Sequence, residues 1–461
     1  MKPGVQLEGQ RVLVVGLART GIASALFCRE RGALVTATDA SPAEALAEAS
    51  ARLRAAGIAL ELGGHSTETF LRQDLIIQSP GVPLEIEPFA AARARAIPIW
   101  SEIELAWRFL RGKMIAVTGS NGKTTTTALL GHIFQTQGMH TLVGGNIGTA
   151  LISEVHESTE ATVTVCEVSS FQLESIVAFR PELAVWLNLT PDHLDRHGTF
   201  EAYGKAKARI FANQTEQDTA ILNADDPQTL PYAPSRPRVL WFSRLKSIEY
   251  GAWLEGDRIV YRDDRRVIPL LRRSDIPLPG DHNVENVLAA ACAAFRGGAT
   301  PEGIAHGVRT FQGVEHRLEF VAEIAGVRYY NDSKATNVDA TLKAIAAFPG
   351  RLLIILGGKD KGSDYTPLRD PLRERARLAL LIGAAAAKIE SQISGAVAVE
   401  QAGTLAGALR IAARRAVAGD VVLLAPACAS FDQFQNYEHR GRVFKELVAA
   451  LHDEFAHKEA R

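Results

Sequence analysis

The 461-residue sequence is poor in cysteine, carries almost no excess of either charge, and has no long apolar run. Its 4 cysteines lie far apart without a CxxC pair, which argues against disulfides or a zinc knuckle and predicts buried, reduced thiols. With 51 Lys and Arg against 52 Asp and Glu, the formal net charge is -1, so no overall basic field would attract a nucleic acid. No stretch approaches about eighteen apolar residues, and the N-terminus MKPGVQLEGQ lacks a signal-peptide core. We therefore expect a cytoplasmic protein with no nucleic-acid and no membrane partner.

Apolar strands followed by small-residue loops and helices recur along the chain, which is typical of doubly wound α/β architecture. The length suits about three domains at ~150 residues each, and we place them at 1–111, 112–313 and 314–461. Short alternating runs between about 240 and 278 predict small antiparallel strands. The main predicted strands are 11–15, 33–38, 114–118, 161–167, 183–189, 352–356, 378–381 and 421–424, and an alanine-rich helix is predicted over 402–417.

The segment TGSNGKT at 118–124 joins a predicted strand to a predicted helix. Backbone N–H groups at such a helix N-terminus bind phosphate. Lys123 would neutralise the β- and γ-phosphates, and the Thr124 hydroxyl would lie where it can ligate Mg²⁺. The usual P-loop has a glycine at the place of Val117. A simple glycine turn would explain the glycines but not Gly-Lys-Thr directly after a strand, so we predict a phosphate site.

Two later strands also end in groups that suit a metal. Glu167 closes an apolar strand, from which a carboxylate can reach a metal over the phosphate loop, although an ordinary strand-end acid is the alternative. The next strand opens onto a loop with Asp192, His193, Asp195 and His197. We expect a metal ligand among these four, whose spacing does not choose between them; the alternative is a solvated polar loop.

Lys207 lies on the apolar face of a predicted helix, in line with Phe200, Tyr203, Gly204 and Phe211. A lysine in such a stripe is costly unless it is paired or modified, because burial disfavours its charge. A snorkelling lysine is the alternative. We interpret Lys207 as a functional residue.

The first strand leads into Gly16-x-Ala18-x-x-Gly21, and Asp39 closes the next strand. This pattern is similar to a dinucleotide-binding fingerprint, except that Ala18 replaces the middle glycine. A diphosphate could rest on this helix N-terminus in either case. Because a dehydrogenase would not need a second phosphate loop one domain later, a protein that binds two nucleotides fits better than a nicotinamide-dependent oxidoreductase.

Taken together, these motifs make the chain resemble the Mur ligase family over nearly its whole length. TGSNGKT, EVSSFQL at 167–173 and NLTPDHLDRH at 188–197 follow the family's order and spacing and also mark the folylpolyglutamate synthases. NDSKATN at 331–337 and PACASFDQF at 426–434 point to the member that adds D-glutamate. Further matches are NADD at 223–226, HNVENVLAA at 282–290 and EHRLE at 315–319.

The resemblance implies a Rossmann-like domain for a UDP moiety at 1–111, a central P-loop ATPase-type α/β domain at 112–313, and a Rossmann-like domain for the amino acid at 314–461. Lys123, Glu167, His193 and Lys207 would be catalytic, with Lys207 carbamylated. Two Mg²⁺ ions would be held by Thr124, Glu167, His193 and Lys207. ATP would be bound by Gly119, Ser120, Asn121, Gly122, Lys123, Thr124, Thr125, Asn283, Asn286, Arg317 and Asp332.

The resemblance also implies the substrates, UDP-N-acetylmuramoyl-L-alanine and D-glutamate. Tyr437 stands where the family often has phenylalanine. Lys359 is an alternative to Lys361 as the lysine that contacts D-glutamate. The residues for the muramoyl substrate would be Leu17, Ala18, Asp39, Ser79, Gly81, Asn146, Ser169 and Gln172, and further substrate-binding residues, mainly for D-glutamate, would be Lys334, Thr336, Lys361, Ser430, Phe431 and Tyr437.

The resemblance implies an ATP-dependent amide ligase of peptidoglycan precursor synthesis, which we expect to be a monomer. The carboxylate of the precursor attacks the γ-phosphate of ATP, and the amine of D-glutamate attacks the resulting acyl phosphate. A folylpolyglutamate synthase, an oxidoreductase and a non-catalytic nucleotide-binding module are the rival interpretations. The choice of D- over L-glutamate rests on the resemblance alone.

Overall fold

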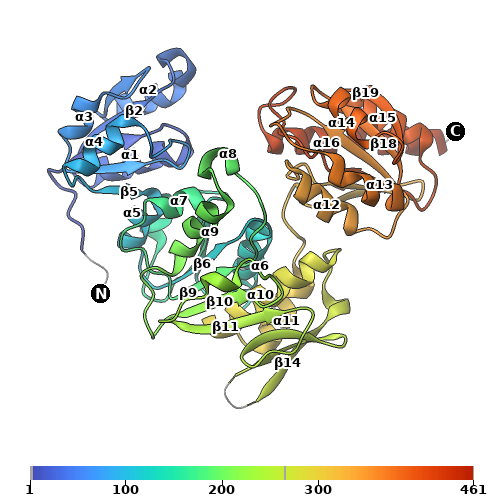
Figure 1. Cartoon of the computed structure of the whole chain (residues 1–461), viewed down its shortest axis with the longest axis horizontal. Coiled ribbons are helices and arrows are strands. Elements are labelled where there is room, and N and C mark those ends of the chain that lie inside the picture. The colour runs from blue at the N-terminus through green and yellow to red at the C-terminus, as the bar shows by residue number, and fades with distance from the viewer. Residues whose placement is uncertain (1–3, 264–265, 460–461) are drawn as a thin grey trace. The chain divides into compact units, whose positions relative to one another are not determined.

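The computed structural model describes residues 4–263 and 266–459. They form two compact units, coloured blue to yellow and orange to red in Figure 1 apart from short exchanged segments. The first unit contains the residues up to Asp275 together with Glu285–Phe311, and the second contains Ile276–Val284 together with the residues from Gln312 onward.

The first unit begins with a five-stranded parallel sheet in the order β3-β2-β1-β4-β5. Alternate residues of β1 enter two different cores, because Val12 and Val14 pack on one face and Leu13 and Val15 on the other. The order changes direction at β1, so the loops after β1 and β4 lie where doubly wound sheets bind ligands. The elements are β1 (Arg11–Val15), α1 (Arg19–Glu30), β2 (Leu34–Asp39), α2 (Ala47–Ala55), β3 (Ala59–Leu62), α3 (Thr67–Leu71), β4 (Leu75–Gln78), α4 (Glu87–Ala94), β5 (Ile99–Ser101) and α5 (Glu102–Phe109).

A nine-stranded sheet completes the first unit, in the order β14-β13-β12-β11-β10-β9-β6-β8-β7. It is parallel from β7 to β12, and β12, β13 and β14 are antiparallel. Its strands are β6 (Lys113–Thr118), β7 (Thr141–Gly145), β8 (Val163–Glu167), β9 (Leu183–Trp186), β10 (Thr219–Asn223), β11 (Arg238–Ser243), β12 (Gly251–Glu255), β13 (Arg258–Arg262) and β14 (Val267–Arg272). Its helices are α6 (Lys123–Gln135), η2 (Leu151–Glu157), α7 (Ser170–Glu174), α8 (Leu194–His197), α9 (Phe200–Ala208), α10 (Asp281–Gly297, whose first residues belong to the second unit) and α11 (Pro301–Thr310).

Helix α5 joins these two sheets within the first unit. Glu104 accepts backbone N–H bonds from Val177, at 2.9 Å, and Phe179, at 2.7 Å, while Glu102 accepts one from Ile152 at 2.7 Å. One hydrophobic core also runs through both sheets, from Leu7 to Leu222. Buried carboxyl groups need such donors, and these bonds from α5 fix the first sheet to the second.

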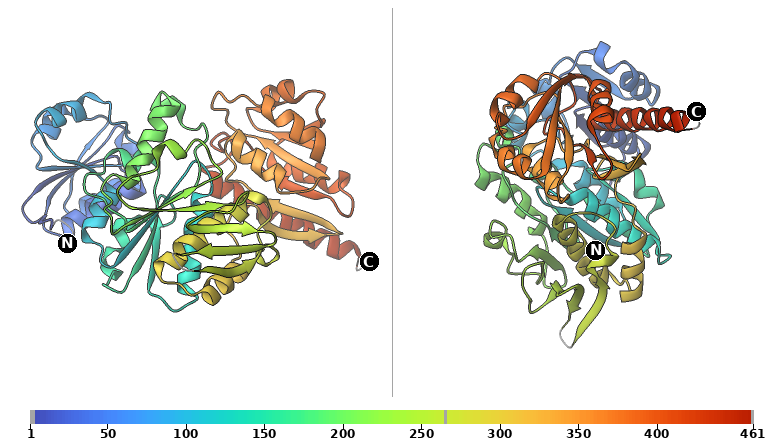
Figure 2. Two further views of the ribbon diagram at one scale, coloured as in Figure 1. Left: turned by 60° about the horizontal axis from the view of Figure 1, so that its bottom comes forward. Right: turned by 90° about the vertical axis from the view of Figure 1, so that its right-hand side faces the viewer.

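The second unit is built on a six-stranded sheet in the order β15-β16-β20-β17-β18-β19, parallel except for the β15–β16 pair. Both of its faces are covered, and Figure 2 shows the long helix α16 running past the sheet. The elements are β15 (Glu319–Ile324), β16 (Val327–Asn331), α12 (Val338–Ala346), β17 (Leu352–Gly357), α13 (Arg369–Arg375), β18 (Ala376–Ile382), α14 (Ala386–Ile393), β19 (Ala398–Gly403), α15 (Leu405–Arg415), β20 (Val421–Leu424) and α16 (Tyr437–Glu459).

The predicted α/β class is confirmed, as are the antiparallel strands between 240 and 278 and the four buried, free cysteines. Three predicted elements were too long, and one of them, the strand expected over 161–167, begins only at Val163. The helix expected over 402–417 is α15, which begins only after Thr404 caps it. The strand expected over 183–189 ends at Trp186, because the chain then turns beneath the phosphate loop.

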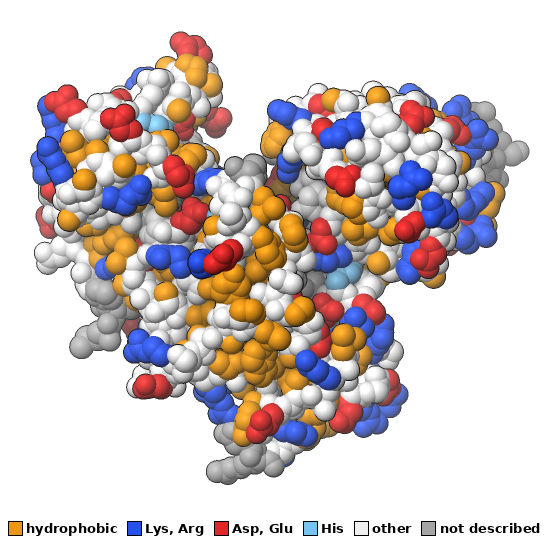
Figure 3. All heavy atoms as spheres, in the orientation of Figure 1, with side chains coloured by type: hydrophobic (Ala, Val, Ile, Leu, Met, Phe, Trp, Pro, Cys, Tyr) orange, Lys and Arg blue, Asp and Glu red, His pale blue; other side chains and the backbone are white. Residues whose placement is uncertain are grey.

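No helix in the described part of the chain is both long and apolar enough to cross a membrane. On the face drawn in Figure 3, side chains of both charges are interspersed, in keeping with the formal net charge of -1.

Candidate active site

The phosphate loop leads from β6 directly into α6. Its two glycines have positive φ, 154° at Gly119 and 85° at Gly122, which disfavours any other residue. A Cβ on Gly122 would also lie 2.3 Å from Asn286 Oδ1, so Asn286 closes the loop from α10. Thr124 and Thr125 are buried in the first turn of α6. The loop therefore presents backbone at a helix N-terminus, as a phosphate site requires.

The segment after β9 holds this loop in place. Asn121 N–H donates to Asn188 Oδ1 at 2.9 Å, and Asn188 Nδ2 donates to Asn121 O at 3.1 Å. Ser120 Oγ donates to Thr190 O at 2.9 Å. Sequence patterns did not indicate Asn188 and Thr190 as supports of this loop, because their partners are distant along the chain.

Two lysines meet at one carbonyl of the loop. Lys123 Nζ and Lys207 Nζ each donate to Gly119 O at 2.8 Å, and Lys123 Nζ also donates to Ser120 O at 2.9 Å. Lys207 is 1% exposed and lies 4.6 Å from the centre of the Tyr203 ring. Burial, and then the charge of Lys123, hold the pKa of Lys207 well below its usual value. The predicted burial of Lys207 is confirmed.

Glu167 lies at the end of β8, as predicted. Asn146 Nδ2 donates to its Oε1 at 2.8 Å, and its backbone carbonyl accepts from Asn146 N–H at 2.9 Å. Its Oε2 is buried and has no hydrogen-bond partner among the described residues. A buried carboxylate oxygen without a donor is costly unless a cation or a ligand group satisfies it.

The two histidines of the 192–197 segment differ in environment. The His193 side chain is 46% exposed, on a left-handed residue with φ 54°, and its ring meets Phe171 edge-on. The His197 side chain is 3% exposed, stacks on Phe171, and contacts Ser170 Oγ at 3.0 Å and Glu174 Oε1 at 3.2 Å. His197 is therefore occupied by structural contacts, whereas His193 is accessible; the side chain of Asp195 lies outside the described part.

The loops after β1, β2 and β4 meet at one edge of the first sheet. Leu17 N–H donates to Asp39 Oδ2 at 2.7 Å, and Ser79 Oγ donates to Gly16 O at 2.8 Å. Although burial alone raises the pKa of Asp39, the bonds from Leu17 and Ser41 lower it overall. Ala18, at the N-cap of α1, and Gly81, in the turn after β4, are exposed beside them.

Three other residues assigned to the muramoyl substrate lie beside the second sheet. Asn146 supports Glu167, as described above. Ser169 and Gln172 form a capping box at the start of α7, with Ser169 N–H donating to Gln172 Oε1 at 3.0 Å. This pair has a structural role that the sequence reasoning did not foresee.

In the second unit, two of the residues predicted for the nucleotide, Arg317 and Asp332, line a cavity of about 20 Å³. Arg317 and Asp332 share it with His282, Lys334 and Lys343. Burial raises the pKa of Asp332 to about 6, against the opposing effect of Arg317. Asn283 Nδ2 donates to Pro279 O at 2.7 Å in the same unit.

The residues predicted for D-glutamate lie on three loops at the carboxyl ends of β16, β17 and β20. Backbone bonds join these loops, from Ala427 N–H to Ala335 O at 2.9 Å and from Lys359 N–H to Ala429 O at 2.8 Å. The 333–337 loop also reaches α16, since Lys334 Nζ lies 5.5 Å from the ring of Tyr437. The loops carry Thr336, Lys361, Ser430 and Phe431, and the Phe431 side chain is 65% exposed.

Comparison with known proteins decides the family. Three family models match in order: the Mur ligase MurD-like N-terminal domain at 10–101, the Mur ligase middle domain at 117–294, and the Mur ligase glutamate ligase domain at 316–428. The UDP-N-acetylmuramoylalanine--D-glutamate ligase of Acidobacterium capsulatum is 55% identical, over 97% of this chain and 97% of its own. That of Koribacter versatilis is 54% identical, over 97% of this chain and 99% of its own. The chain belongs to the Mur ligase family.

Solved structures agree with the Mur ligase fold. UDP-N-acetylmuramate-alanine ligase from Thermotoga maritima matches with a TM-score of 0.60 at 19% identity, over 96% of this chain and 99% of that one. A likeness at this identity concerns the fold alone. The family predicted from the motifs is thus confirmed, and the individual site residues stay predictions.

The residues of this Mur ligase suit a nucleotide and a divalent cation in different degrees. The phosphate loop suits a triphosphate, and the unpartnered Glu167 Oε2 suits a cation. Lys207 as an ammonium does not suit a cation, but it would as a carbamate. Within residues 4–263 and 266–459, no cluster of three or more His, Cys, Asp or Glu side chains could hold a metal by itself.

Sequence reasoning missed two supports of the loops in the second unit. Arg440 is fully buried and donates to Ser333 O at 2.8 Å and to Cys428 O at 3.2 Å. Asp360 accepts from Tyr365 Oη and from Lys388 Nζ, both at 2.8 Å. The signal available in the sequence was an arginine close after PACASFDQF, and its position alone does not indicate which groups it contacts.

Proposed function

We propose that this Mur ligase joins D-glutamate to UDP-N-acetylmuramoyl-L-alanine with the consumption of ATP, as a cytoplasmic monomer in peptidoglycan precursor synthesis. The relatives at 55% and 54% identity, which carry the name of this ligase, support the choice of substrates. The structural observation that carries the proposal is the meeting of Lys123 and Lys207 at Gly119 O, beside the phosphate-binding helix N-terminus.

Lys123 is proposed to act on the transferring phosphoryl group. Its ammonium lies at the mouth of the loop, where it would turn from the carbonyls of Gly119 and Ser120 to the β- and γ-phosphates. ATP would supply the phosphoryl group that converts the muramoyl carboxylate into an acyl phosphate. Two Mg²⁺ ions would be held by Thr124, Glu167, His193 and carbamylated Lys207.

The substrates are assigned to the two ends of the chain. The UDP moiety would rest at the edge formed by Leu17, Asp39 and Ser79, in a domain spanning 1–111. ATP would occupy the domain at 112–313, with Arg317 and Asp332 contributed from the third domain. D-glutamate would be held by the joined loops of the domain at 314–461.

The direct test is phosphate release from ATP with Mg²⁺ and UDP-N-acetylmuramoyl-L-alanine, with D- and L-glutamate supplied separately. Release that requires both the muramoyl substrate and D-glutamate would support the proposal. Release with another amino acid alone would retain the ligase chemistry and reassign the substrate. Release with L-glutamate and a folate acceptor would favour a folylpolyglutamate synthase instead.

A further inference from the structure

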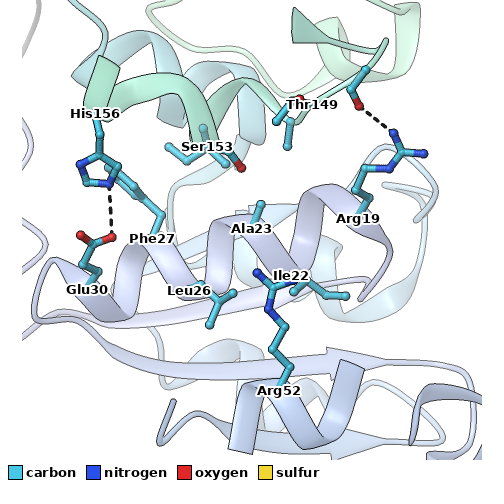
Figure 4. Close-up of a pocket in the computed structure, with 13 residues that line it drawn as sticks. Arg19, Ile22, Ala23, Leu26, Phe27, Glu30, Arg52, Thr149, Ser153 and His156 are labelled. Carbon is cyan, nitrogen blue, oxygen red and sulfur yellow. Dashed lines mark hydrogen bonds and ion pairs between the residues drawn. The ribbon is translucent and has the colours of Figure 1, made fainter. Parts of the chain in front are cut away.

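A groove of about 630 Å³ lies between the first sheet's helices and the second sheet's η2, wholly within the first unit (Figure 4). Helix α1 forms one wall along most of its length, and the 148–156 segment forms the other. The volume falls within the range of small-molecule sites, about 300 to 1,000 Å³. None of its lining residues belongs to the sets proposed for ATP, the muramoyl substrate or D-glutamate.

The middle of the groove is apolar. Ile22, Ala23 and Leu26 line it from α1, and Ala150 and Ile152 line it from the other wall. Ile22, Ala23 and Leu26 follow each other at a helical spacing, so they present one continuous stripe on α1. Such a surface suits an aromatic ring or a short acyl chain.

Positive charge predominates at the rim. Arg19 Nη1 donates to Gly148 O at 2.6 Å at one end, and His156 Nε2 lies 3.3 Å from Glu30 Oε2 at the other. Arg52, on α2, extends toward the groove between Ile22 and Leu26 (Figure 4). In the part of the chain that the structure describes, neither arginine is paired with a carboxylate. The lining holds two guanidinium groups against one acid, Glu30, which lies at the far end beside His156, so an anionic group near Arg52 would find net positive charge.

We propose that this groove binds a small amphipathic anion, with an aromatic or acyl body on the α1 stripe and one acidic group beside Arg52. The site does not depend on the proposed reaction, because it uses no residue of the catalytic or substrate sets. The groove is nevertheless close in sequence to the proposed catalytic residues, because its lining residues Gly148 and Thr149 follow Asn146, which donates to Glu167 Oε1.

The test uses 8-anilinonaphthalene-1-sulfonate, an aromatic sulfonate whose fluorescence rises in apolar sites, titrated into the full-length protein. We expect saturable binding that Arg52→Met weakens by about tenfold, the loss typical of one charge-assisted contact. Arg54→Met is the matched control, because Arg54 is exposed on the same helix but does not line the groove. It should bind the probe as the unmodified protein does.

Two filling variants locate the probe. Ala23→Phe and Ser153→Phe enter the groove from opposite walls, and each should abolish binding while melting temperature and phosphate release stay near those of the unmodified protein. Unchanged binding in both filling variants, or equal weakening by Arg52→Met and Arg54→Met, would overturn the proposal. So would displacement of the probe by UDP-N-acetylmuramoyl-L-alanine, since the groove would then be part of the substrate site.

Discussion

Lys123 and Lys207 donate to the same oxygen, Gly119 O, each at 2.8 Å. Two ammonium groups that share one acceptor repel each other, and Lys207, at 1% exposure, has little water to screen it. The pKa of Lys207 is therefore lowered by burial and then by Lys123, which favours the neutral amine. Only a neutral amine can add carbon dioxide and become a carbamate.

Lys207→Ala should lower phosphate release by about a hundredfold, because an anionic ligand group would be lost. Added formate or acetate should restore part of the activity by occupying the vacated space. Lys205→Ala is the matched control, since Lys205 is exposed on the same helix and pairs with Glu201 at 2.6 Å. If neither carboxylate restores activity, carbamylation of Lys207 loses its main support.

Lys123→Ala should abolish ligation, with at least about a hundredfold loss of kcat, because its charge would act directly on the phosphoryl group. The measurement is substrate-dependent phosphate release at saturating ATP. The fold should survive, since the loop is also anchored by Asn188 and Thr190. Turnover above about a tenth of the normal rate would exclude this role for Lys123.

The 358–364 loop offers two lysines, Lys359 and Lys361, one on each side of Asp360, and we predict that Lys361 contacts D-glutamate. Lys361 directly follows Asp360, which Tyr365 and Lys388 fix in place. Lys361→Met should raise the KM for D-glutamate by about tenfold with little change in the KM for ATP. Lys359→Met, the neighbouring control, should leave both constants nearly unchanged. The opposite pattern would transfer the role to Lys359.

Glu102 should make stability depend on pH. Burial raises its pKa from the usual 4.5 to about 7 in the folded protein, despite the bond from Ile152 N–H. Between these values the folded state keeps a proton that the unfolded state releases, so this contribution to stability falls as pH rises from about 4.5 to 7. The full loss above that window is on the order of a few kcal/mol.

The melting temperature of Glu102→Gln should therefore rise relative to that of the unmodified protein as pH increases from about 5 to 8. The amide oxygen can still accept from Ile152 N–H, so the contact between α5 and η2 survives. Glu157→Gln, an exposed change on η2, serves as the control and should show no such trend. Parallel melting curves for Glu102→Gln and the unmodified protein would contradict this account.

Arg440→Met should destabilise the second unit by roughly 3 kcal/mol or more, because buried acceptors on two loops would lose their donor. The affected groups are Ser333 O, Cys428 O and Ala429 O. Arg442→Met, exposed on the same helix, should change the melting temperature little. Equal effects of the two substitutions would show that the contacts of Arg440 do not support these loops.

Local signals in the sequence were enough for several strands and for the place of the 118–124 loop between β6 and α6, whereas strands such as β7, β10 and β16 were not predicted. A run such as Arg11–Val15 is apolar, β-branched and bounded by glycine, and β1 matches it residue for residue. The Lys207 stripe was also visible, because helical spacing places it with Tyr203.

The contacts that hold the site together could not be predicted in this way. Asn188 supports Asn121, and Arg440 supports Cys428 and Ser333, across sequence separations that no local pattern encodes. The burial of Glu102 could not be predicted either, since an acid in the first turn of a helix usually faces water. Tertiary packing, rather than propensity, decided each of these.

The chain passes between the two compact units three times, at Asp275, at Val284 and at Phe311. A C-terminal fragment that starts at Gln312 would therefore lack the 276–284 segment, including His282, which lines the cavity with Arg317 and Asp332. On the ribosome, this segment is made before the sheet of the second unit, and His282 must wait for Asp332 and α12 to emerge. Expression of the second unit on its own would need this early segment grafted back, so dissecting the protein at a single cut would remove one wall of the cavity that His282 lines.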